Sequence, residues 1–299
     1  MNKSCLVMRR SKSWHGIPID VLKSQMQKSI RRGNGDEAVK AFASMANMEH
    51  LYPGQSQAKA IRTNAINRVI ISALEDVGVA NPTLVLWVVR KLLPMTWKRA
   101  RSSYCLEAVA QCILELAASR KTRVTSHLYH AYGMRENHEM AREQGLDVHA
   151  VDLSTAPLAD ANCFQCLQQD KQVQDAVVER FLAASFHLGP WRTQIRDAYM
   201  YLSEKRPVVA FALALLHYKV KVEPLLGRTI EPICQARLES LENHDFEMVI
   251  SDDAVDMHTA HGRGLGKTVA DFRSNGARLA NEDPAFHDAA LVYVYINGK

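Results

Sequence analysis

The residues with the clearest chemical potential lie close together near the carboxyl end of the chain. Asp253, Asp256, His258 and His261 offer carboxylate oxygens and imidazole nitrogens within a short stretch. Divalent metals take these ligand types in proteins, and the spacing would let the four side chains converge on one ion. A metal beside a cationic loop would suit a nuclease, because it activates water while the loop holds the scissile phosphate. The alternative is that this Asp-rich stretch only caps the start of a helix and binds no metal.

A glycine-rich loop follows directly, reading HGRGLGKT from His261 to Thr268. It ends as a P-loop does, but His261 replaces the first glycine of that motif, and the 31 residues that follow are too few for an NTPase fold. We therefore predict a loop that binds a phosphate or nucleic-acid backbone without hydrolysing nucleotide, through Gly262, Arg263, Gly264, Gly266, Lys267 and Thr268. The alternative is a flexible connection.

Basic residues gather at three expected helix ends, two of them beside aromatic residues. Cations at helix ends also stabilise the helix dipole, which accounts for one or two such clusters. Three clusters in one half of the chain favour a surface that contacts phosphates. The predicted nucleic-acid contacts are Arg31, Arg32, Lys98, Arg99, Arg101, Lys121 and Arg123.

Charge is divided unevenly along the 299 residues. Residues 1–135 carry 21 Lys/Arg and 8 Asp/Glu, a formal +13, whereas residues 136–299 carry 16 and 24, a formal −8. The basic half would suit an anionic partner, most simply DNA or another nucleic acid. The same division would let the two halves attract each other, within one chain or between copies.

The cysteines and the apolar stretches indicate the cellular compartment of the protein. Six cysteines in a chain of this length, without an apolar leader, predict a reducing intracellular setting, either cytoplasm or nucleus, and a viral source is compatible with it. Cys163 and Cys166 form only half of a zinc site. The basic first 19 residues lack the amphipathic face of an organellar transit peptide. The longest apolar stretches are shorter than a membrane span, so no membrane association is expected.

Helical periodicity dominates from residue 19 onward and predicts a mainly α protein. A nearly all-apolar helix over residues 83–93 is expected to end at Pro94. Residues 247–250 and 290–296 are the candidates for short strands, the second being equally compatible with a terminal helix. We expect a basic arm at residues 1–18, a basic, collar-like helical domain at 19–135, and an acidic, mostly helical domain at 136–299.

Three stretches of the basic half resemble a known family. They are residues 23–45 (KSQMQKSIRRGNGDEAVKAFASM), residues 67–82 (NRVIISALEDVGVANP) and residues 107–132. They resemble the C-terminal helical region of the RarA/MgsA family, clamp-loader-like AAA+ ATPases of replication and recombination. The resemblance covers about residues 19–133 and departs from the family at Ala118-Ser119-Arg120-Lys121, where the family's proline is missing. The family's ATPase module, which precedes this region, is absent from the chain.

The resemblance implies a helical collar and oligomerisation module with DNA-transaction partners, and it does not imply ATP hydrolysis. The leading hypothesis is a non-enzymatic nucleic-acid-binding accessory protein of DNA replication, recombination or repair. It would form a homo-oligomer through its collar and contact replication proteins, and it would need no cofactor. The alternative is a nuclease-like, metal-dependent enzyme that acts on nucleic-acid phosphates through residues 252–267.

Overall fold

The computed structural model describes residues 11–97, 104–133, 136–146, 182, 189, 191–202, 204–220, 222 and 232–298. Several predictions fall outside these ranges. They concern most of the basic arm, the basic cluster Lys98, Arg99 and Arg101, and the half zinc site Cys163 and Cys166.

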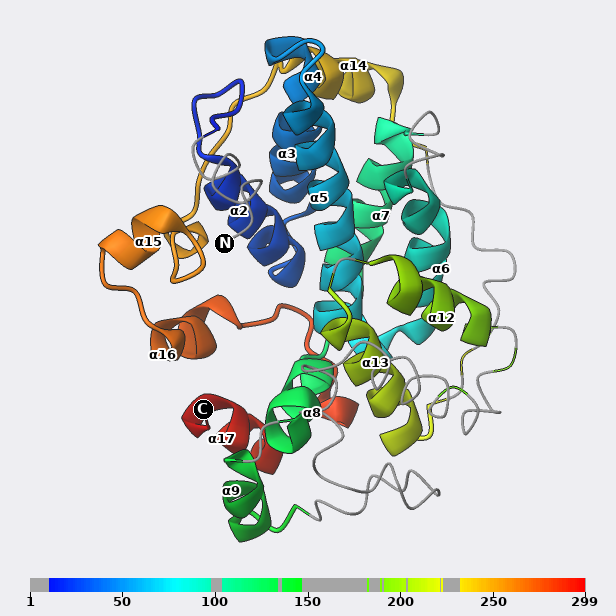
Figure 1. The fold of residues 1–299 in the computed structure, drawn as a ribbon, viewed down its shortest axis with the longest axis vertical. Coiled ribbons are helices and arrows are strands. Elements are labelled where there is room, and N and C mark those ends of the chain that lie inside the picture. The colour runs from blue at the N-terminus through cyan, green and yellow to red at the C-terminus, as the bar shows by residue number, and fades with distance from the viewer. Residues whose placement is uncertain are drawn as a thin grey trace. The chain divides into compact units, whose positions relative to one another are not determined.

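The chain is mainly α-helical, as the sequence predicts (Figure 1). Within the described ranges there is no β-strand, and the bridges that occur are isolated ones, such as the antiparallel bridge between Lys12 and Pro18. The fold therefore rests on helix packing.

The chain divides into two compact units, and each draws on three separate segments. Unit 1 comprises Met1–Ser72, Arg90–Ser119 and Leu226–Asn281. Unit 2 comprises Ala73–Val89, Arg120–Leu225 and Glu282–Lys299. Helix α6 (Pro82–Leu92) carries the chain from unit 2 into unit 1. The domain boundaries expected from the sequence stay a prediction.

Four long helices form the core of unit 1. They are α2 (Ile19–Arg31), α3 (Gly35–Ala46), α5 (Ser56–Ser72) and α7 (Leu106–Ala118). Helix α3 packs against the other three, and α2 also contacts α5 and α7. The apolar positions that repeat along each helix are buried in this core, among them Leu22, Met26, Ile30, Phe42, Ile66 and Ile113.

Glycines separate α2 from α3 and allow α3 to approach α7. Gly33 ends α2 with a φ of +78°, a left-handed conformation that favours glycine. A Cβ on Gly35 would lie 2.9 Å from Cδ2 of Leu114 in α7. The Gly33-Asn34-Gly35 break expected from the sequence thus both turns the chain and permits close helix packing.

Shorter elements complete unit 1. They are α4 (Met48–Leu51), the 3₁₀ helix η3 (Leu93–Thr96), α14 (Gln235–Asn243), the 3₁₀ helix η6 (Asp252–Ala254), α15 (Ala260–Gly264), α16 (Val269–Asp271) and the π-helix η7 (Phe272–Gly276). The segment from η6 to η7 contacts α2 and contains the predicted metal and phosphate sites.

Unit 2 is built around α8 (Val124–Gly133). This helix contacts α9 (Asn137–Glu143), α13 (Arg206–His217) and α17 (Ala289–Asn297). The other described elements are the π-helix η1 (Ala73–Val77), the 3₁₀ helices η2 (Gly78–Ala80) and η8 (Pro284–Phe286), and α12 (Trp191–Tyr201).

Neither candidate strand forms, and the second stretch takes the helical alternative. Residues 247–250 have no regular secondary structure, and residues 290–296 belong to α17. The carboxylate of Asp288 caps α17 by accepting hydrogen bonds from the backbone N–H groups of Ala290 and Leu291, at 3.0 and 3.1 Å. Leu291, Val294 and Tyr295 then fall on one buried helical face. The β-branched and aromatic residues that suggested a strand pack here as helix residues.

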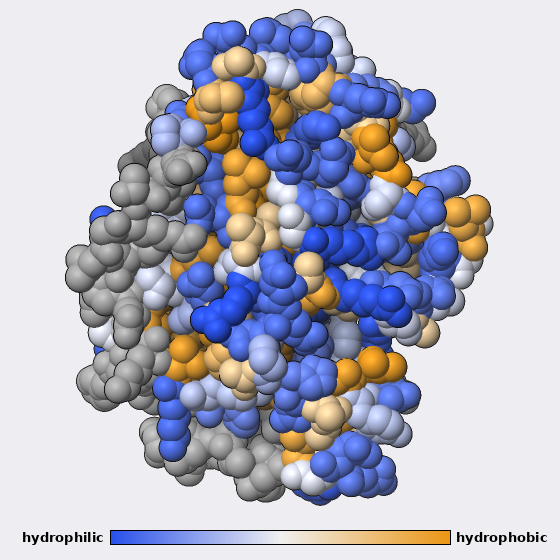
Figure 2. Space-filling model, turned by 180° about the vertical axis from the view of Figure 1, so that it is seen from behind, coloured by the Kyte–Doolittle hydropathy of each residue, from blue (hydrophilic) through white to orange (hydrophobic). Residues whose placement is uncertain are grey.

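The surface bears scattered apolar side chains. Most of the face in Figure 2 is hydrophilic, with hydrophobic residues in separate patches. Among the described helices, none combines the length and the apolar character that crossing a membrane requires.

Candidate functional site

Arg31 and Arg32 lie at the end of α2, and both are held by unit 1 itself. Arg31 is buried: its Nη1 donates to the carbonyl of Gly276 at 3.1 Å, and its guanidinium lies 5.5 Å from the centre of the Phe272 ring. Arg32 Nη2 lies 2.5 Å from Oδ2 of Asp253. These two arginines therefore fasten the segment from η6 to η7 to α2.

Lys121 and Arg123 lie inside unit 2. The Lys121 side chain is fully buried, and burial lowers the pKa of its amine to about 8. Arg123 donates from Nη1 to Oδ1 of Asp76 at 2.8 Å and from Nη2 to the hydroxyl of Tyr295 at 3.2 Å. Basic residues in these positions cannot reach a phosphate on the surface. Arg31, Lys121 and Arg123, which the sequence predicted as surface contacts, are thus buried in their units.

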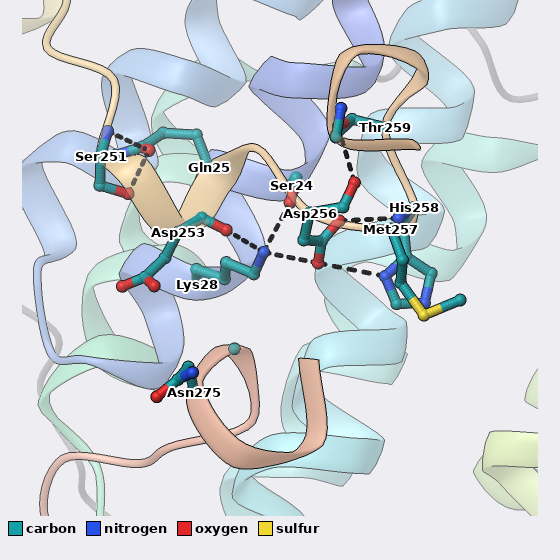
Figure 3. A network of polar contacts seen from close by, with 12 residues as sticks. Ser24, Gln25, Lys28, Ser251, Asp253, Asp256, Met257, His258, Thr259 and Asn275 are labelled. Carbon is teal, nitrogen blue, oxygen red and sulfur yellow. Dashed lines mark hydrogen bonds and ion pairs between the residues drawn. The ribbon is translucent and has the colours of Figure 1, made fainter. Parts of the chain in front are cut away.

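Asp256 is the centre of a buried polar network in unit 1 (Figure 3). Its Oδ2 lies 2.6 Å from Nζ of Lys28 and 3.1 Å from Nδ1 of His258. Burial by itself would raise the pKa of Asp256, but the hydrogen bonds from His258 and Lys28 outweigh it and hold that pKa well below its usual value. The carboxylate is thus ionised and already engaged.

Lys28 completes this network from α2. Its Nζ also donates to Oγ of Ser24 at 3.2 Å and to the backbone carbonyl of Asp253. Burial lowers the pKa of Lys28, while the carboxylate of Asp256 opposes that shift. One buried ammonium group therefore ties residues 253 and 256 to α2.

Of the four predicted metal ligands, Asp256 and His258 are in contact, but the other two lie apart from them. Asp256 pairs with Lys28, the carboxylate of Asp253 pairs with Arg32, and His261 is an exposed residue of α15. The described residues include no group of three or more His, Cys, Asp or Glu side chains that could hold a metal ion. Lys28 and Arg32 pair with the two carboxylates that the sequence analysis assigned to a metal ion.

The glycine-rich loop is a capped helix rather than an open nest of N–H groups. At its start, Oγ1 of Thr259 accepts the N–H of Gly262 at 3.0 Å. At its end, Gly266 donates to the carbonyl of Arg263 at 3.1 Å and Lys267 donates to that of Gly262 at 3.0 Å. This pair of bonds is the Schellman motif, and Gly266 occupies its left-handed position with a φ of +73°.

Two other features of the loop serve the fold. A Cβ on Gly262 would lie 1.9 Å from the carbonyl oxygen of Asp256, so only glycine fits there. The side chain of Thr268 accepts the N–H of Asp271, whose carboxylate accepts the N–H of Thr268 in return. The backbone N–H groups on which the phosphate prediction depended are thus donated within the chain.

Cationic side chains of the same segment do face solvent. Arg263, Lys267 and Arg278 are exposed, and no carboxylate of the described residues forms an ion pair with any of them. Leu265 and Val269 are also exposed, at 59% and 43%. We call residues 260–278 the cationic segment. It contains four Lys/Arg and one acidic residue, Asp271, whose carboxylate caps α16.

Hydrogen bonds join the chain to α2 at the start of the cationic segment and just beyond its end. At the start of α2, the carboxylate of Asp20 accepts the N–H of Ala260 at 2.7 Å. At the end of α2, the carbonyl of Arg31 accepts the N–H of Ala280 at 2.8 Å. The Lys28–Asp256 pair holds the chain between η6 and α15 against the last turn of α2. The backbone that carries the exposed cations is therefore held in place by α2.

Sequence analysis missed Lys28, which positions the segment. The available signal is its place on the buried face of α2, among Gln25, Met26 and Ser29. A lysine on such a face implies an acidic partner. The partner lies 228 residues away, so the sequence could not identify it.

The comparisons with known proteins add no relative to this geometry. No protein-family model, no curated protein and no solved structure matches the chain.

Proposed function

We propose that this chain is a nucleic-acid-binding accessory protein that contacts backbone phosphates through the cationic segment of unit 1. The observation that carries the proposal is the exposure of Arg263, Lys267 and Arg278 without ion-pair partners among the described residues. Exposed and unpaired cations keep their charge available, and binding to phosphates releases counterions from the nucleic acid. Because the backbone of the cationic segment is held to α2, less conformational entropy is lost on binding.

A role in DNA replication, recombination or repair, self-association through a helical collar and contacts with replication proteins belong to the same proposal. They rest on the resemblance of residues 19–133 to the RarA/MgsA family. The long helices of unit 1 suit that part of the proposal, since they include α2 and α3 over residues 19–46.

The proposal assigns binding rather than catalysis to residues 252–267. The nuclease alternative needs the carboxylates of Asp253 and Asp256 for a metal. Those groups are engaged by Arg32, Lys28 and His258, so a metal would have to displace a buried ammonium group. No observation on the described residues favours the alternative.

A matched pair of charge reversals tests the proposal. The first variant carries R263E, K267E and R278E. The control carries R142E, R196E and K219E, three exposed cations of unit 2 without ion pairs to described residues. Because each reversal subtracts two charges, both variants move from +5 to −1. We expect the affinity for a 15-nucleotide oligo-dT at low salt to fall at least about tenfold in the first variant.

The control variant is expected to stay within about threefold of the wild type, because its substitutions leave the cations of the proposed binding segment unchanged. Equal losses in both variants would mean that bulk charge drives binding, and would remove the cationic segment as the site. A wild-type protein that does not bind the oligonucleotide at low salt would refute the function itself. Circular dichroism of both variants checks that the helices remain.

A further inference from the structure

An exposed tryptophan stands on a locked turn just before α2. The turn, residues 11–18, is closed by two backbone hydrogen bonds of 2.9 Å, from Ser13 to Ile17 and from Gly16 to Ser13. Gly16 has a φ of +73°, which permits the reversal. We call these residues the Trp14 loop. The loop holds Trp14 near its tip with a defined backbone.

His15 fixes this loop to the rest of unit 1. Its Nε2 lies 3.1 Å from the carbonyl oxygen of Phe246, and its Nδ1 lies 3.2 Å from Oγ of Ser44 in α3. The imidazole also contacts the Phe246 ring, with 4.9 Å between the ring centres. The position next to Trp14 is thus held by two separate parts of the unit.

The Trp14 ring is stacked on His244. The two ring centres are 5.1 Å apart, and the planes differ by 5°. His244 is buried, with 8% of its surface exposed, and neither of its ring nitrogens has a hydrogen-bond partner. Burial lowers the pKa of His244 to about 4, and the nearby His15 and His50 contribute, so the ring is neutral at pH 7.

Trp14 itself remains 51% exposed although His244 covers one face. Tryptophan normally buries its apolar surface. Trp14 instead packs one ring face on His244 and leaves the other side of the ring open to solvent. The stack fixes the orientation of the ring. A planar ligand could therefore add to the stack without further ordering of the protein.

The chain near this ring carries cationic side chains. Lys12 in the same loop is exposed. The loop leads directly into α2, and the first turn of α2 holds the start of the cationic segment through the bond from Ala260 to Asp20. The Trp14 loop and the start of α15 are therefore both joined to the start of α2.

We propose that Trp14 is a stacking platform for a base of single-stranded nucleic acid whose backbone continues onto the cationic segment. The inference rests on the proposed function and narrows its substrate class. Bases in a duplex have neighbours on both faces, whereas an unpaired base offers a free face to an aromatic ring. Stacking of this kind tolerates any sequence, because every base has such a face.

The test compares Trp14→Ala and Trp14→Phe with the wild type on three probes of equal length. The probes are a 15-nucleotide oligo-dT, the same backbone with abasic units in place of the bases, and a 15-base-pair duplex. We expect W14A to bind oligo-dT about tenfold more weakly, and W14F to recover most of that loss. On the abasic strand and on the duplex, W14A is expected to match the wild type.

Tyr293→Ala supplies the control, since Tyr293 is an aromatic residue of unit 2 that is 46% exposed. It should leave all three affinities unchanged. An unaltered affinity of W14A for oligo-dT would overturn the platform, and so would an equal loss on the abasic strand. If the R263E, K267E and R278E variant loses binding while W14A does not, the proposed function survives alone. If the wild type binds none of the probes, both proposals fall.

Discussion

Arg123→Met is expected to lower the free energy of unfolding by about 3–5 kcal/mol, the cost of leaving a buried charge without its partner. The Asp76 side chain is fully buried, and Arg123 Nη1 donates to its Oδ1 at 2.8 Å. The same guanidinium donates to Tyr295 and lies 5.7 Å from the centre of its ring. The substitution therefore disturbs η1, α8 and α17 together. Urea unfolding measured by circular dichroism gives the loss.

Arg120→Met is the matched control, because Arg120 also pairs with an aspartate of unit 2. Its Nη1 lies 3.1 Å from Oδ2 of Asp283, but its side chain is 72% exposed. The Asp283 carboxylate is buried but also accepts the N–H of Ala285 at 3.1 Å, and Arg120 is solvated, so we expect a loss of about 1 kcal/mol or less. Replacing Asp76 by leucine in the R123M background should recover part of the stability, since it removes the stranded carboxylate. An R123M variant no less stable than R120M would contradict the buried network.

Lys28→Met is expected to lower the free energy of unfolding by about 3 kcal/mol and to weaken nucleic-acid binding at the same time. The substitution removes the ammonium group that joins Asp256, Ser24 and the carbonyl of Asp253. The cationic segment would then keep its terminal anchors to α2 and the contacts of Arg31 and Arg32, but it would lose its buried ion pair. Urea unfolding gives the stability, and titration with oligo-dT below the unfolding transition gives the affinity.

Arg237→Met provides the comparison for this variant. Arg237 pairs with Asp36 on the surface of unit 1, with both side chains more than a third exposed, so we expect a loss of about 1 kcal/mol or less. In the K28M background, Asp256→Asn should restore part of the stability by removing the unpaired charge. Equal losses for K28M and R237M would show that the buried pair does not anchor the segment.

A pH series gives a second readout on Asp256. Because the pKa of this carboxyl in the folded protein lies below 3.8, its contribution to stability is present at neutral pH and disappears as pH falls below that value. The K28M variant lacks one of the two hydrogen bonds that lower this pKa, so its stability should depend less on pH in that range.

Helices could be predicted from sequence because their signals are local. The apolar repeat over residues 83–93 lies within one residue of α6 at each end, and the Gly33-Asn34-Gly35 break falls between α2 and α3. The last helix was ambiguous because its β-branched and aromatic residues also suit a strand. The cap at Asp288 and the burial of one face favour the helix over the strand. That burial depends on contact with α8.

Site residues could not be predicted as well because their roles depend on distant partners. Arg31, Lys121 and Arg123 form basic clusters in sequence, but Asp76 and the segment from η6 to η7 lie in other parts of the chain. The glycine-rich loop suggested a phosphate nest, and the carbonyl oxygen that excludes a side chain at Gly262 belongs to Asp256. The stack of Trp14 on His244 joins residues that no sequence pattern connects.

The salt dependence of oligo-dT binding tests the central claim most directly, because it counts the phosphate contacts that the cationic segment supplies. Three such contacts on single-stranded DNA predict that log K falls with log[salt] with a slope of about −2 from this segment alone. We expect the wild type and the R142E, R196E and K219E control to have the same slope. The R263E, K267E and R278E variant should be shallower by about 2. Equal slopes in all three proteins, or a wild-type affinity that does not change with salt, would contradict the account.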